Sequence, residues 1–79
     1  MGGVMAMVVF AQVKEAAVLG AAVRVDAHAL TPPQWLELAA IAAQSGARIE
    51  VARAGKLTAA QRQSLADAAG SLILFDFAG

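Results

Sequence analysis

Apolar and charged residues alternate in two short segments of the chain. In residues 22–27 the charged positions are Arg24 and Asp26, and in residues 48–53 the charged position inside the apolar run is Glu50. Alternation with a period of two is typical of a β-strand that buries one face and exposes the other. We therefore expect strands over both segments, each with one charged face.

A third segment, residues 72–77, has a different pattern and predicts a last strand that is apolar on both faces. On one face we place Leu72, Leu74 and Asp76, and on the other Ile73, Phe75 and Phe77. As a terminal strand it would present apolar side chains beside an unpaired backbone edge. Such an edge is a template for pairing with another chain.

Helix boundary signals lie between these strands. Thr31 and Thr58 suit the N-cap position, where a hydroxyl accepts a hydrogen bond from a backbone N–H in the first turn. Pro32 follows at the first helical position, where a missing N–H costs nothing. Gly46 and Gly70 suit the left-handed position that closes a helix. These signals predict a helix before each of the last two strands.

The two helices, expected over residues 32–45 and 58–69, belong to an internal repeat. The sequence Leu-Thr-Pro-Pro-Gln, which begins at Leu30, resembles Leu-Thr-Ala-Ala-Gln, which begins at Leu57. Each motif opens an alanine-rich stretch that leads to a β-type segment. A weaker copy, with a helix over residues 14–19, precedes the first strand.

Strands that alternate with helices indicate a parallel sheet. A parallel sheet covered on both faces is apolar throughout its strands, whereas two strands here carry charges at alternate positions. We therefore predict an α/β fold, a small parallel sheet built from repeated helix–strand units, with the helices mainly on one face. Residues 1–79 form a single repeat-like domain in this interpretation.

The apolar segment 4–10 allows two interpretations. As a buried strand it would make the chain β-α-β-α-β-α-β, and we favour this because it continues the alternation. Alternatively, it extends the helix that reaches residue 19.

Composition narrows the classes of function. The chain has 79 residues, no Cys, one His and zero formal net charge, and 59% of its residues are hydrophobic. So short a chain is marginally stable alone, and this composition favours association. The chain has no basic stripe of the kind that indicates nucleic-acid binding. No segment supplies about 20 apolar residues for a membrane span. With one His and no Cys, the available ligand side chains argue against a metal or cofactor. We expect a cytoplasmic protein, since the absence of Cys fits a reducing compartment.

Trp35 shares a helical stripe with Leu38, Ala39 and Ala42, and this spacing predicts a core position. A surface anchor is the alternative, because Trp is favoured at interfaces. Arg62 takes the corresponding place in the next repeat.

We find no catalytic signature, and the sequence favours a non-catalytic interaction or self-assembly module that binds itself or another protein. Arg24 and Glu50 are expected to form a cross-strand ion pair on the exposed face. The candidate partner-binding residues are Leu72, Leu74, Phe75, Phe77, Arg24 and Glu50.

The alternative is a small-ligand or regulatory domain that uses the carboxyl ends of the strands, where ligands gather in parallel sheets. His28 follows Asp26 by two residues, and Arg53 and Asp76 fall near the same rim. A His–Asp pair can act as a base, but no nucleophile accompanies this one.

Overall fold

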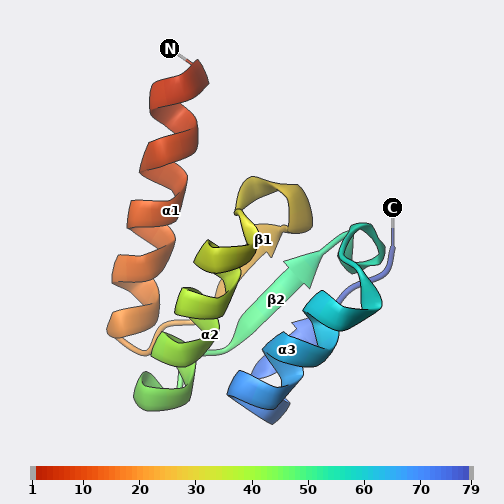
Figure 1. The fold of residues 1–79 in the computed structure, drawn as a ribbon. Coiled ribbons are helices and arrows are strands. Elements are labelled where there is room, and N and C mark those ends of the chain that lie inside the picture. The colour runs from red at the N-terminus through yellow and green to blue at the C-terminus, as the bar shows by residue number, and fades with distance from the viewer. Residues whose placement is uncertain (1, 79) are drawn as a thin grey trace.

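Helices and strands alternate along the whole described chain, which in this computed structural model comprises residues 2–78, with side chains from residue 10 onward. Three 3-10 helices lie between the main elements (Figure 1). In chain order the elements are α1 (Gly2–Val18), β1 (Val23–Asp26), η1 (Ala27–Ala29), α2 (Pro32–Ser45), β2 (Ile49–Ala52), η2 (Ala54–Lys56), α3 (Ala59–Ala69), η3 (Gly70–Leu72) and β3 (Ile73–Phe75).

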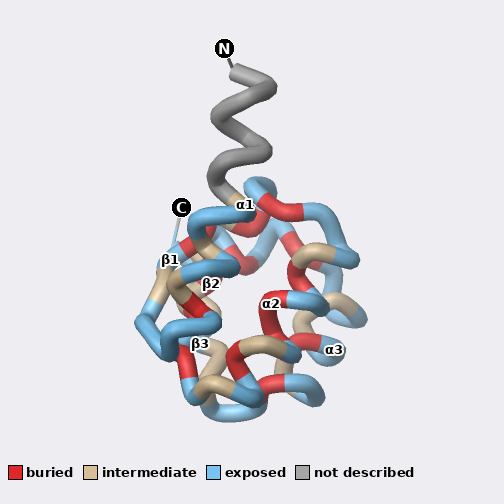
Figure 2. Tube along the Cα trace, turned by 90° about the vertical axis from the view of Figure 1, so that its left-hand side faces the viewer, coloured by how far each residue is buried: buried red, intermediate tan, exposed pale blue. Residues whose placement is uncertain are grey.

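The strands form a parallel sheet in the order β1-β2-β3, which confirms the predicted fold class. The register places Arg24 opposite Glu50 and Glu50 opposite Leu74. Figure 2 shows the sheet on one side of the molecule and α2 and α3 on the other. The face that carries Arg24, Glu50 and Leu74, which none of the described helices covers, is called the open face below.

The preferred interpretation of residues 4–10 as a strand is wrong, because this segment belongs to helix α1. No Pro or Gly interrupts the chain between residue 4 and Gly20, and Met5, Ala6 and Met7 within the segment favour a helix. The apolar run also lacks the alternation of a half-buried strand. The described sheet therefore has three strands rather than four.

Both predicted N-caps are confirmed, and each forms a full capping box. The Thr31 hydroxyl accepts a hydrogen bond from Gln34 N–H, and Gln34 Oε1 accepts one from Thr31 N–H at 2.9 Å. Thr58 and Gln61 exchange the same two bonds, at 3.1 and 2.8 Å. The starts of α2 and α3 are thus defined by local bonds before any packing is considered.

The two predicted glycine ends differ. Gly46 has φ 80° and ψ 9°, the left-handed conformation expected at the end of α2. Gly70 also has a positive φ, 56°, but its ψ of −127° is not the left-handed conformation, and the chain continues into η3. Leu72 consequently lies in η3 rather than in a strand. β3 is shorter than the expected range 72–77.

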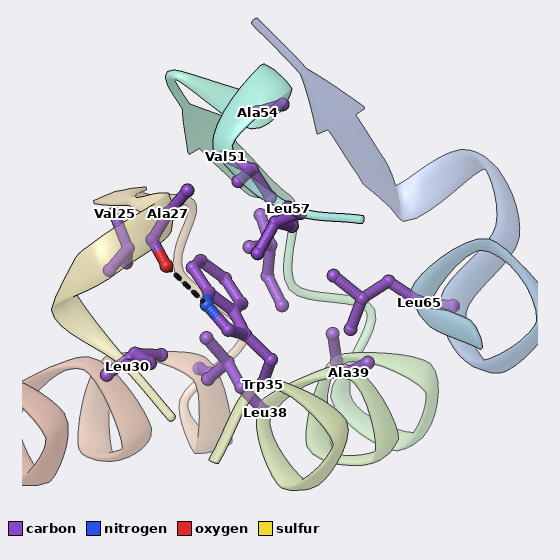
Figure 3. Packing of buried hydrophobic residues seen from close by; sticks show 14 of the residues in the cluster. Val25, Ala27, Leu30, Trp35, Leu38, Ala39, Val51, Ala54, Leu57 and Leu65 are labelled. Carbon is purple, nitrogen blue, oxygen red and sulfur yellow. Dashed lines mark hydrogen bonds between the residues drawn. The ribbon is translucent and has the colours of Figure 1, made fainter. Parts of the chain in front are cut away.

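The core lies between the sheet and the helices, with Trp35 in it as the spacing predicted (Figure 3). Trp35 is 3% exposed, and its Nε1–H donates a 3.0 Å hydrogen bond to Ala27 O. At the β1 end, Ala17 of α1 is fully buried, while Phe10 and Val13 pack against the same cluster. Helix α1 therefore closes that end of the core.

Arg62 occupies in α3 the place that Trp35 occupies in α2. Its Nη1 donates to Ala54 O at 3.2 Å and to Leu57 O at 2.6 Å. In both helices the side chain binds the carbonyl eight residues earlier, at the start of a 3-10 helix. The Arg62 guanidinium thus makes the same kind of hydrogen bond to the backbone as the Trp35 indole.

Candidate functional site

Apolar side chains gather at the end of the layered structure that lies opposite α1. Leu74 and Phe77 are 60% and 61% exposed, although both are large and apolar. Leu72, Ile73 and Phe75 are only partly buried against the core. These five residues are called the C-terminal end below. At the α1 end Ala17 is fully buried, whereas Val18 and Leu19 are exposed. The C-terminal end differs in that its exposed apolar side chains lie on and beside an edge strand of the sheet.

The backbone of β3 has a free edge among the described residues, since β3 is the last strand of the sheet. Asp76 N–H donates to Val51 O at 2.9 Å, and Asp76 O accepts from Ala54 N–H at 2.8 Å. Because successive residues of a strand direct their backbone groups to opposite edges, those of Ile73 and Phe75 point away from β2. The Ile73 N–H already donates to Gly70 O at the end of η3. The groups available to a further strand are therefore the Ile73 C=O and both backbone groups of Phe75.

Three charged side chains form a cluster on the open face. Arg24 pairs with Glu50 through Nη1, as the sequence predicted, and donates to Asp76 Oδ2 from Nη2 at 2.8 Å. The bond from Arg24, together with one from Ala78 N–H, lowers the pKa of Asp76. Sequence reasoning placed Asp76 in the ligand rim rather than with Arg24. The strand register was the signal that could have joined them.

A second ion pair joins the ends of β1 and β2. Arg53 binds Asp26 through Nε and through Nη2, the latter at 2.9 Å. Arg53 has a positive φ of 54°, the only one among the described residues other than glycine. Strands β1 and β2 pair residues that are 26 apart in the sequence, whereas the carbonyls of Ala27 and Ala54, which Trp35 and Arg62 bind, are 27 apart. Arg53 is therefore the extra residue at the exit of β2.

This ion pair predicts acid sensitivity. The pKa of Asp26 is lowered from 3.8 to about 2, chiefly by the hydrogen bonds from Arg53 and next by the one from His28 N–H. A carboxyl group whose pKa is lower in the folded state than in the unfolded state stabilises the fold at pH values above its unfolded pKa. That stability is lost as the pH falls from about 4 to about 2. We expect the urea midpoint of the wild type to fall more over this range than that of Asp26→Asn. Equal pH dependence in both proteins would contradict the assignment.

The four residues predicted for a ligand rim do not meet in one polar pocket. Asp26 and Arg53 bind each other, and Asp76 binds Arg24 on the open face. His28 donates its backbone N–H to Asp26 Oδ2 at 2.9 Å. Its exposed side chain lines a separate hollow of about 190 Å³ beside Lys56.

The structure adds an apolar hollow that the sequence did not indicate. It lies between the first turns of α2 and α3 and has a volume of about 140 Å³. Its lining residues are Pro32, Trp35, Leu36, Leu57, Ala60, Gln61, Ser64 and Leu65. No sequence signal marks it, because it depends on how closely two helices pack.

Aromatic contacts hold the residues after β3. The Arg62 guanidinium lies 5.4 Å from the centre of the Phe77 ring, which is within the range of a cation–π interaction. The Phe75 and Phe77 rings are 6.2 Å apart. Phe77 is thus held over α3, and the edge of β3 stays uncovered by the chain that follows within the described residues.

The described part of the chain contains no group of three or more His, Cys, Asp or Glu side chains that could hold a metal ion. No described helix combines the length and apolar character that a membrane crossing needs. Comparison with family models, with curated proteins and with solved structures finds no match to this chain. Its function is therefore inferred from its own geometry and charges.

Proposed function

We propose that this protein is a non-catalytic interaction module that associates with a second copy of itself through the C-terminal end. One observation carries the proposal: the free edge of β3 is flanked by the exposed side chain of Leu74, whereas α1 closes the opposite end of the core. An exposed edge with apolar side chains favours pairing with another chain.

The energetics support association. Complete burial of one exposed Leu or Phe side chain contributes about 1.5–3 kcal/mol, and the C-terminal end offers Leu74 and Phe77. The total stability of a 79-residue domain is only about 4–12 kcal/mol at the usual values per residue. With no Cys for disulfides, the chain gains stability from covering these residues.

The polar groups also favour an interaction module over an enzyme. The carboxylates of Asp26, Glu50 and Asp76 are each paired with an arginine. The hydroxyls of Thr31 and Thr58 cap helices, and that of Ser45 donates to Ala17 O. These groups serve the fold, and they leave no evident pair of base and nucleophile.

The test is the solution mass of the untagged chain, measured by light scattering over a concentration series. We expect the mass to rise above the 8.0 kDa of the monomer as concentration increases. Leu74→Lys places a charge beside the β3 edge and should shift the midpoint at least tenfold towards higher concentration. Leu36→Lys, on the exposed side of α2, is the control and should leave the midpoint unchanged. A monomer at every concentration would overturn the proposal.

A further inference from the structure

We infer that two copies pair β3 with β3 in antiparallel orientation, about a two-fold axis at Leu74, so that one sheet continues across both molecules. This inference rests on the proposed self-association and adds its geometry. A symmetric contact of this kind uses the same surface on both copies, as in most protein dimers.

The backbone satisfies this arrangement. Phe75 directs its N–H and C=O groups to the free edge, and Ile73 directs its C=O there, because Asp76 directs its own groups towards β2. The Ile73 N–H already donates to Gly70 O. With the axis at Leu74, Ile73 of each copy faces Phe75 of the other copy, and the Phe75 N–H can donate to the Ile73 C=O across the pair. The two-fold axis gives two such bonds. The whole three-residue strand is then used.

The side chains also fit the antiparallel pairing of β3 with β3. Leu74 lies on the open face opposite Glu50, and the axis places it directly against Leu74 of the second copy, at a Cα separation of about 4.5 Å. On the other face, Ile73 lies against Phe75 of the second copy. Pairs of aromatic and β-branched side chains stabilise antiparallel strands. All of these residues are at least partly exposed in the single chain.

Shifted antiparallel registers fit less well. An axis at Phe75 would place Leu74 against Asp76 of the second copy, and an axis at Asp76 would place two carboxylates together. Like charges directly opposite each other destabilise a strand pair. The register centred on Leu74 is the one that brings only apolar residues together over the length of β3.

The edge of β1 in a second copy is a less favourable pairing partner for β3 than β3 itself. It carries the charged residues Arg24 and Asp26, and charges on an edge strand oppose pairing. Continuing the β2–β3 register in parallel would also bring Asp76 beside Asp26 of the next copy.

Charge identifies the occupant as a second copy. Residues 72–75 contain no charged side chain, and the nearest carboxylate, Asp76, is already bound by Arg24. With zero formal net charge, two copies approach without repulsion, whereas a charged partner would find no complement at this end. A pair of short strands buries less than the roughly 800 Å² per partner of a standard interface. The dimer should accordingly dissociate in about the micromolar range.

Disulfide trapping tests the geometry, because the chain has no cysteine of its own. The axis brings the Cα atoms at position 74 to about 4.5 Å, within the roughly 4.4–6.8 Å that a disulfide bridges. In a glutathione redox buffer we expect Leu74→Cys to form a covalent dimer at least tenfold faster than the control Leu36→Cys. A mixture of Leu74→Cys and Arg24→Cys should give mainly the symmetric Leu74→Cys dimer.

The outcomes separate this inference from the proposed function. Equal trapping rates for the two variants, in a wild type that still dimerises by light scattering, would overturn the strand pairing and leave self-association standing. Dominant cross-links between Leu74→Cys and Arg24→Cys would instead establish the parallel arrangement and overturn the two-fold axis. A wild type that remains monomeric, with no preferential trapping, would overturn both.

Discussion

Replacement of Trp35 by Ala should leave most of the protein unfolded at room temperature. Trp35 is 3% exposed and packs in the centre of the core between the sheet and α2. Truncation of a buried Trp costs about 3–5 kcal/mol, which reaches the lower end of the roughly 4–12 kcal/mol expected of a domain of this length. Urea titration followed by circular dichroism should show little or no folded baseline for Trp35→Ala.

Two further variants separate the causes of this loss. Trp35→Phe keeps an aromatic ring but removes the hydrogen bond from Nε1–H to Ala27 O, and we expect it to remain folded while losing about 1–3 kcal/mol. Leu36→Ala changes the next residue, which is 47% exposed, and should cost less than about 1 kcal/mol. A Trp35→Ala protein as stable as Leu36→Ala would contradict the role given to the indole.

Leu65→Ala should release α3 from the rest of the molecule. Leu65 and Ala69 are the buried residues of this helix, and Leu65 is the only large one. Removing a fully buried Leu costs about 2–5 kcal/mol, and α3 has no other large apolar side chain to replace it. Since α3 leads directly into η3 and β3, hydrogen exchange should accelerate in both α3 and β3 before the remainder of the chain opens.

The controls for Leu65→Ala lie in the same helix. Gln63→Ala removes an exposed side chain that donates to Asp67 and should leave exchange nearly unchanged. Leu65→Met keeps the buried volume and should cost less than about 1.5 kcal/mol. Uniform acceleration of exchange in all elements of Leu65→Ala would show that α3 does not open separately.

The sequence predicted well those features that depend on residues close to one another along the chain. The caps at Thr31 and Thr58 depend on residues within one helical turn, and both are present. The alternation around Arg24 and Glu50 reports which strand face is buried, and their cross-strand pair follows from it. Residues 4–10 were misjudged because a continuous apolar run has no period that distinguishes a strand from a helix.

The candidate site was predicted only in part, because its geometry depends on register and on chain insertions. Asp76 reaches Arg24 across β2, a contact that follows only once the three strands are aligned. Arg53 meets Asp26 because one extra residue with a positive φ follows β2, and nothing in the local pattern marks that insertion. The exposure of Leu74 and Phe77 was expected from the apolar last segment, and it is observed.

The closure of one end of the core by α1 bears on how large an assembly can become. Molecules with two mutually complementary ends add to one another without limit and form fibres, whereas molecules with one adhesive end stop at the pair. Here Ala17 is buried and Phe10 and Val13 pack against the core, so α1 covers the core at the β1 end, although Val18 and Leu19 are exposed there. The edge of β1 also carries Arg24 and Asp26, unlike the C-terminal end. Growth through pairing of β3 is therefore expected to end at two copies.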